Sequence, residues 1–170
     1  MNSQTSKRDT PVVVNDACVL TTCVEQKVTR PTLIVDTNVV IAGLLTTRNG
    51  SSVQVEAAHI YRSMLSAEIP FALSDALLAE YRAVLTRAEL CERHGLTADE
   101  IDALLRDLAA RATMVTPVKA SAAPDPGDQL LWELLAARAD LLLVTGDKLL
   151  LRDAGMRGRV VTPKRCLTTV

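Results

Sequence analysis

Aromatic side chains make up only 2% of this 170-residue chain: one Trp, two Tyr and one Phe. RRM and OB modules bind single-stranded nucleic acid by stacking bases on exposed rings. So few rings argue against a stacking platform of that kind. The chain also lacks an excess of charge, with a net charge of −1. A nearly neutral protein does not attract nucleic acid over long distances, so such a partner would have to be held by local basic groups.

Long apolar runs are missing as well. No stretch reaches the roughly 18 residues that a membrane-spanning helix needs. The N-terminal residues contain neither the apolar core nor the cleavage site of a secretory signal. We therefore expect a cytoplasmic protein with no membrane partner.

Cysteine is sparse, and its four positions are scattered: Cys18, Cys23, Cys91 and Cys166. Cys18 and Cys23 have no second Cys or His pair at zinc-binding spacing, which argues against a structural zinc site. We expect incidental or buried thiols in a reducing compartment.

The chain does contain the material for one folded domain. A length of 170 residues with 48% hydrophobic content allows about 70% of the unfolded surface to be buried. Residues 1–30 stand apart as an N-terminal extension that we expect to be partly disordered or arm-like. From residue 31 on, short apolar segments alternate with amphipathic helical patterns, which predicts an α/β fold around a mainly parallel sheet. Residues 46–52 are polar and predict a loop.

Two of the apolar segments end in an acid. Residues 33–35 lead into Asp36, and residues 141–144 lead into Thr145, Gly146 and Asp147. The carboxyl ends of parallel strands meet at one edge of a sheet, so Asp36 and Asp147 should emerge together. The alternative is that Asp36 or Asn38 only caps the helix that follows.

Two further acids lie on helical patterns. Glu80 borders the apolar stripe of a helix that Ser74 would cap, and an ordinary solvated glutamate is the alternative. Asp125 and Pro126 fit an N-cap followed by the first helical residue, which places Asp128 on the buried side of the first turn. Stabilisation by the helix dipole is the alternative role for Asp128.

The four acids would form an unusual cluster if they converged. Two like charges about 4 Å apart repel by roughly 4 kcal/mol at an effective dielectric of about 20. Several such pairs exceed what a marginally stable domain tolerates unless protons or cations neutralise them. Oxygen ligands with no Cys or His nearby favour Mg²⁺ or Mn²⁺ over zinc. Such a cluster suits cleavage of phosphodiesters by a metal-activated water.

The order of the motifs resembles that of PIN-domain proteins, and among them the toxins of bacterial toxin–antitoxin systems. The motifs are Leu-Ile-Val-Asp-Thr-Asn-Val at 33–39, Ser74 to Leu85 with Glu80-Tyr81, Asp-Pro-Gly-Asp at 125–128 and Val-Thr-Gly-Asp-Lys-Leu-Leu at 144–150. The resemblance covers about residues 31–167 and implies an α/β/α sandwich with ribonuclease activity that depends on Mg²⁺ or Mn²⁺. Residues 31–170 would then form a PIN-like nuclease domain.

The resemblance also implies roles for individual residues. Four acids would bind the metal and carry catalysis: Asp36, Glu80, Asp128 and Asp147. Asn38 and Thr145 match polar positions that support such a site. The family often has another acid where this chain has Gly127, so Asp125 is a possible participant.

Partners are implied in the same way: an RNA substrate, a cognate antitoxin protein and a second copy of the chain in a homodimer. Four arginines are candidates to grip the RNA backbone, with Arg87 expected on the same helix side as Glu80: Arg48, Arg62, Arg82 and Arg87. Solvated positions or ion pairs with neighbouring acids are the alternative for each of them.

Other functions fit less well. A PIN fold with an idle metal site, acting only by binding a partner, is the main alternative. A haloacid-dehalogenase-type phosphatase would need an Asp where this chain has Asn38. Dinucleotide binding would need a Gly-x-Gly-x-x-Gly motif after a strand, and the chain has none.

Overall fold

The computed structural model describes residues 30–50, 52–153, 155–156 and 158–169. The expected N-terminal extension, except for Arg30, lies outside the described residues, and so do Cys18 and Cys23. In the described part of the chain, no helix combines the length and the apolar character needed to cross a membrane.

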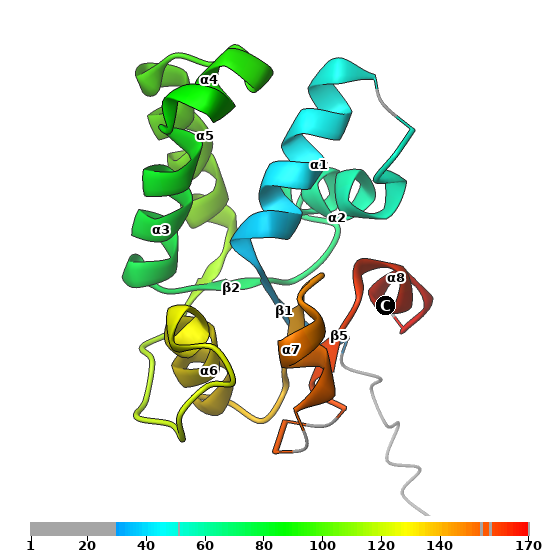
Figure 1. The fold of residues 1–170 in the computed structure, drawn as a ribbon, viewed down its shortest axis with the longest axis vertical. Coiled ribbons are helices and arrows are strands. Elements are labelled where there is room, and N and C mark those ends of the chain that lie inside the picture. The colour runs from blue at the N-terminus through cyan, green and yellow to red at the C-terminus, as the bar shows by residue number, and fades with distance from the viewer. Residues whose placement is uncertain (1–29, 51, 154, 157, 170) are drawn as a thin grey trace, which may run out of the picture.

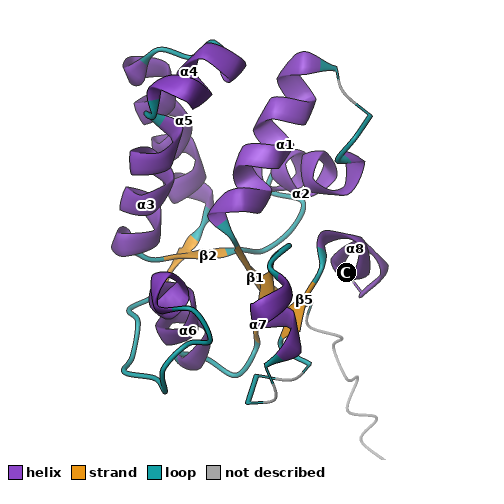
Figure 2. Ribbon diagram, viewed as in Figure 1, coloured by secondary structure: helices purple, strands orange, loops and turns teal. Residues whose placement is uncertain are grey.

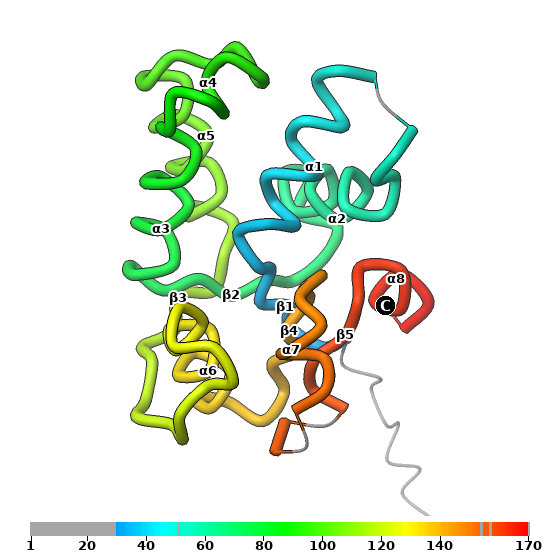
Figure 3. The backbone as a smooth tube through the Cα atoms, in the orientation of Figure 1, coloured from blue at the N-terminus to red at the C-terminus, as the bar shows by residue number. Residues whose placement is uncertain are grey.

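The described strands are short, all pair in parallel, and run through the middle of the molecule (Figures 1 and 3). A bridge between Leu33 and Phe71 joins a three-stranded sheet to a two-stranded one, giving the order β3-β2-β1-β4-β5. Every residue of the two central strands, β1 and β4, is buried, as expected inside a parallel sheet. The strands are β1 (Thr32–Val35), β2 (Ala72–Leu73), β3 (Thr113–Met114), β4 (Leu141–Val144) and β5 (Val160–Val161).

Helices surround these strands and confirm the α/β/α arrangement (Figure 2). In Figure 1, α3, α4 and α5 stand together on one side of the molecule, α1 and α2 stand beside them, and α6 and α7 lie at the other end. The helices are α1 (Thr37–Asn49), α2 (Val55–Leu65), α3 (Asp75–Leu85), α4 (Ala88–His94), α5 (Ala98–Arg111), the short 3₁₀ helix η1 (Pro126–Asp128), α6 (Gln129–Ala136), α7 (Lys148–Arg152) and α8 (Pro163–Thr169).

The prediction of a loop over residues 46–52 was wrong for its first half. Helix α1 continues to Asn49 and ends at Gly50, whose φ of 61° is the left-handed conformation that favours glycine at this position. Leu45 and Thr46 are buried, so packing of this turn against the core outweighs its polar composition. The cap predicted at Ser74 is confirmed at the start of α3, and Thr97 with Glu100 forms a capping box at the start of α5.

Helices α1 and α2 pack unusually closely at Gly43. A Cβ atom there would lie 2.5 Å from the carbonyl oxygen of Ala57 and 2.5 Å from the Cβ of Tyr61. No real Cβ makes such contacts, so only glycine allows this approach. The contact holds α1, whose first turn follows Asp36, firmly against α2.

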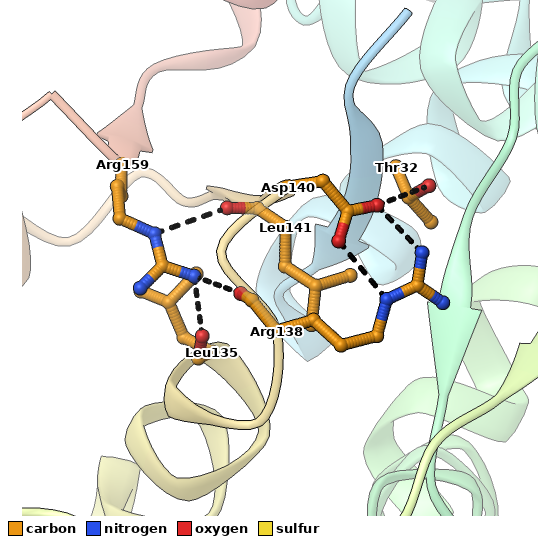
Figure 4. Close-up of polar contacts among 6 residues, drawn as sticks. All are labelled: Thr32, Leu135, Arg138, Asp140, Leu141 and Arg159. Carbon is orange, nitrogen blue, oxygen red and sulfur yellow. Dashed lines mark hydrogen bonds and ion pairs between the residues drawn. The ribbon is translucent and has the colours of Figure 1, made fainter. Parts of the chain in front are cut away.

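Arg159 fastens the amino-terminal end of β4 (Figure 4). Its guanidinium donates hydrogen bonds to the carbonyl oxygens of Leu135 in the last turn of α6, of Arg138 just after that helix, and of Leu141 in β4. One side chain thus satisfies carbonyls that the end of the helix leaves unpaired.

Asp140 links the starts of the two central strands (Figure 4). Its carboxylate forms an ion pair with Arg138, at 2.6 Å, and accepts a hydrogen bond of 3.4 Å from the hydroxyl of Thr32. Thr32 begins β1 and pairs with Leu141. These contacts help to fix the register of β1 against β4, and hence which residues leave the sheet together at its opposite edge.

We expect Arg159→Ala to lower the free energy of unfolding by about 2 kcal/mol, because it leaves several carbonyls without their donor. Arg159→Lys should restore only part of this, since an ammonium group cannot reproduce the planar fork. Urea unfolding measures both effects, with Arg152→Ala on the exposed end of α7 as the control. An Arg159→Ala variant as stable as the wild type would show that the hydrogen bonds of Arg159 do not stabilise the fold.

Candidate active site

The two acid-ended strands are neighbours, as the sequence predicted. Strands β1 and β4 pair in parallel, and the N–H of Asp36 continues the ladder by donating to the carbonyl of Val144, at 2.9 Å. From β1 the chain runs outward to β2 and β3 on one side, and from β4 it runs outward to β5 on the other, so the strand order reverses between β1 and β4. Parallel sheets bind ligands at the carboxyl end of such a switch point.

Asp36 is almost fully buried, with 4% of its surface exposed. One carboxylate oxygen caps α1 by accepting a hydrogen bond of 3.0 Å from the N–H of Asn38. The other accepts a hydrogen bond from the hydroxyl of Thr145. The capping role, considered as an alternative for Asp36, is therefore real, but it uses only one of the two oxygens.

Thr145 connects two of the acids. Its side chain is fully buried, and its hydroxyl donates to Asp36 while accepting a hydrogen bond of 2.9 Å from the N–H of Asp147. Asp147 in turn caps α7, accepting from the N–H of Leu149 at 2.6 Å. A single hydroxyl thus fixes the ends of both central strands relative to each other.

Glu80 reaches the same edge from α3. It is half-buried and accepts a hydrogen bond of 2.6 Å from the hydroxyl of Thr37. The next residue, Tyr81, is buried and donates to the carbonyl of Val35, the last residue of β1. Burial, helped by the charges of Asp36 and Glu80, raises the pKa of Tyr81 well above its ordinary value, so its hydroxyl keeps the proton it donates.

No role was predicted for Thr37 or Tyr81 from the sequence. Each directly follows one of the acids in the chain, and that adjacency was the available signal. It could not show that Thr37 donates across to α3, because this contact joins residues 43 positions apart.

Asp128 lies at the junction of η1 and α6, where the charges of the other predicted site acids raise the pKa of its carboxyl. Its pKa is raised to about 6, first by burial and then by the negative charges of Asp36, Asp125, Asp147 and Glu80. The structure therefore gathers the four predicted site acids, although their positions span more than a hundred residues of the chain. We call Asp36, Glu80, Asp128 and Asp147 the acidic crevice.

Asp125 has a structural task beside this crevice. Its carboxylate caps η1 by accepting a hydrogen bond of 2.8 Å from the N–H of Gly127, and its side chain is exposed. This matches the N-cap predicted from the Asp-Pro sequence. Asp125 adds negative charge near Asp128.

No basic side chain of the described residues forms an ion pair with an acid of the crevice. The ion pairs of the described chain are elsewhere: Arg82 with Asp102, Arg111 with Asp107 and Arg138 with Asp140. Uncompensated carboxylates at this density favour binding of protons or cations. The donors are all oxygen atoms, the set that suits Mg²⁺ and Mn²⁺. As the described side chains stand, no three His, Cys, Asp or Glu residues are arranged to hold a metal ion.

Two of the four arginines that the sequence suggested as RNA contacts have other roles in the structure. Arg82 is paired with Asp102 at 2.7 Å, so its charge is already compensated. The prediction for Arg87 was wrong, because α3 ends at Leu85 and Arg87 instead begins α4 as its N-cap. Arg48 and Arg62 are exposed on α1 and α2.

A cavity of about 570 Å³ opens beside the crevice. Asp147 and Asn38 form part of its wall, and Lys164 at the start of α8 forms another part. No role was predicted for Lys164 from the sequence. Its signal was weak, because a lysine next to a helix-starting proline is common on protein surfaces.

Comparison with known proteins gives one family match. The family model described as "PIN domain" matches residues 32–149, which is well over half of the chain and includes all four acids of the crevice. No curated protein and no solved structure gave a match.

The raised pKa of Asp128 makes the stability of the metal-free protein depend on pH. A carboxyl with a folded-state pKa of about 6, against an ordinary 3.8, binds its proton more tightly in the folded protein. Stability should therefore fall as pH rises from about 4 to about 6, and the full cost of ionisation is present above that range.

We expect Asp128→Asn to remove this cost. Because solvent screens a half-exposed group, the gain in the free energy of unfolding at pH 7 should be on the order of 1 kcal/mol. The gain should vanish near pH 4. Thermal unfolding with a chelator present measures it, and Asp99→Asn, another acid in a first helical turn, is the matched control. A loss of stability at pH 7 would contradict the crowding of acids around Asp128.

Proposed function

This chain belongs to the PIN-domain family, whose members are generally nucleases, and we propose that it is an endoribonuclease dependent on Mg²⁺ or Mn²⁺. The observation that supports this most is the charge of the crevice. The negative charges of the other three acids add to burial in raising the pKa of Asp128, and no described basic residue forms an ion pair with any of the four. Structural stability alone does not favour such an arrangement.

The donor chemistry of the crevice fits a hard divalent cation. Asp36, Glu80, Asp128 and Asp147 would hold it, with Asn38 at the exposed rim. When bound, Mg²⁺ or Mn²⁺ supplies neutralising charge and lowers the pKa of an attacking water.

The chain's own residues orient these acids. Thr145 holds one oxygen of Asp36, and Thr37 holds one oxygen of Glu80. Tyr81 fastens the end of β1, so that Asp36 leaves the sheet at a fixed point. Asp128 retains a proton on its carboxyl up to about pH 6 in the metal-free crevice. None of these groups has to act as a covalent nucleophile.

The motif order also supports a finer proposal. We infer that the protein is the toxin of a toxin–antitoxin pair, that it acts in the cytoplasm as a homodimer, and that a cognate antitoxin inhibits it. Sequencing of RNA ends after brief expression would identify the target. New ends should accumulate with the wild type and be absent with Asp36→Asn.

We expect purified protein to cleave RNA in the presence of Mg²⁺ or Mn²⁺, and Asp36→Asn to reduce the rate roughly 100-fold or more. Mn²⁺ should raise the melting temperature of the wild type and not that of the variant, because only the former binds the ion tightly. Asp99→Asn, which removes an acid outside the crevice, is the control and should behave like the wild type. Equal cleavage by the wild type and Asp36→Asn would point to a contaminating nuclease. The alternative would then remain that the protein has an idle metal site and acts only by binding a partner.

We expect Thr145→Val to lower kcat at least about 10-fold, because the valine keeps the shape but no longer orients Asp36. Thr145→Ser retains the hydroxyl and should keep most of the activity. Urea unfolding of both variants separates the loss of orientation from a loss of folding. A fully active, folded Thr145→Val variant would show that the hydroxyl has no positioning role.

A further inference from the structure

A second cavity, of about 400 Å³, adjoins the one beside the crevice. The two share wall residues from α1 and from the segment before α2: Asn38, Ala42, Val53 and Gln54. Because they share these residues, the two cavities adjoin each other along α1, and we call them together the α1 groove. Asp147 of the crevice lies at one end of the α1 groove, and Arg93 of α4 lines the part farther from it.

The α1 groove contains two cations that have no partner among the described residues. Lys164 lines the cavity beside the crevice, and Arg93 lines the second cavity. Both side chains are exposed, and neither forms an ion pair or a side-chain hydrogen bond with another described residue. The described acids in the walls are Asp147 and Glu56, and both belong to the cavity that Lys164 lines.

The remaining polar groups of the α1 groove are amides. Asn38 and Gln54 line both cavities, and Asn49 lines the second. Amide groups can contact phosphates, sugars or base edges, since they both donate and accept hydrogen bonds. None of the described wall residues is aromatic, so bases are not held by stacking in the α1 groove.

An RNA substrate needs binding energy from outside the crevice. Four carboxylates repel a polyanion, and the nearly neutral chain provides no long-range attraction. Lys164, in the cavity beside the crevice, and Arg93, in the adjoining cavity, meet this need. Each cavity has the size of a site for one small ligand, which suits a single strand, whereas duplex RNA is recognised across broad surfaces.

We propose that the α1 groove binds the stretch of single-stranded RNA that continues from the scissile phosphate. Lys164 contacts a phosphate near the crevice, and Arg93 contacts one farther along the strand. The inference rests on the proposed ribonuclease function and adds the path of the substrate and the residues that hold it. Because these contacts are to phosphates, they strengthen binding to all sequences alike.

Binding is tested in the Asp36→Asn background, where cleavage does not interfere. Fluorescence anisotropy with a labelled single-stranded RNA of about 12 nucleotides should show Kd raised about 5-fold by Lys164→Ala and by Arg93→Ala. Each substitution should also reduce the slope of log Kd against log salt by about 1. Glu56→Gln should tighten binding, since it removes a negative charge from the wall.

Matched controls come from the same helices. The control variants are Arg165→Ala and Arg87→Ala. Arg165 lies next to Lys164 on α8, Arg87 lies at the start of α4, and neither residue lines the α1 groove. Both controls should bind RNA as the parent does. Circular dichroism and melting temperature confirm that each variant is folded.

Cleavage gives a second test. With the same RNA as substrate, Lys164→Ala and Arg93→Ala should raise KM about 5-fold and leave kcat unchanged. With a dinucleotide, which is too short to extend along the groove, Arg93→Ala should have no effect.

The outcomes separate the two proposals. If the wild type cleaves RNA while Lys164→Ala and Arg93→Ala behave like their controls, the α1 groove is not the path of the substrate. If no metal-dependent cleavage occurs but RNA binding depends on Lys164 and Arg93, the nuclease proposal fails and the groove stands as an RNA-binding site. Equal Kd values for RNA in all the variants would overturn the inference outright.

Discussion

The hydrogen bond from Thr145 to Asp36 is the contact on which the arrangement of the site depends. It joins the ends of the two central strands through a fully buried hydroxyl that also accepts the N–H of Asp147. A buried carboxylate needs such a donor, because its burial without one is costly. The parallel register of β1 and β4 brings donor and acceptor together, and the contacts of Asp140 and Arg159 at the opposite end help to maintain that register.

The crevice combines well-oriented hydrogen bonds with unbalanced charge. Hydroxyl groups, rather than cations, hold Asp36 and Glu80 in place. Hydroxyls orient the carboxylates without cancelling their charge, which leaves that charge available to a ligand. Burial, and after it the charges of the neighbouring acids, raises the pKa of Asp128 to about 6. In a family of nucleases, negative charge of this kind fits the binding of a divalent cation, while the cations that would hold RNA lie a short way off along α1.

The sequence predicted the positions of the site's acidic side chains better than those of its basic side chains, for a physical reason. An acid that ends a buried apolar strand, such as Asp36 or Asp147, stands out because few other positions are so constrained. Arg82 and Arg87 could not be judged in the same way, because surface arginines have no strong local pattern. One proved to be paired with Asp102 and the other to cap α4. Lys164 and Arg93 were missed because they reach the groove only through the packing of α8 against α2 and of α4 against α1.

The sequence by itself determined the alternation of strands and helices, the burial of β1 and β4, the caps at Ser74, Thr97 and Asp125, and the order of the PIN-domain motifs. These features depend on residues close together in the chain, whose apolar periodicity and capping chemistry are local. Only the tertiary structure decided that Thr37 reaches Glu80, that Asp128 lies near the negative charges of the other acids, and that α1 continues into the polar stretch as far as Asn49. Those outcomes depend on contacts between distant segments, because the energy of a buried charge or a packed turn is set by its neighbours in space rather than in sequence.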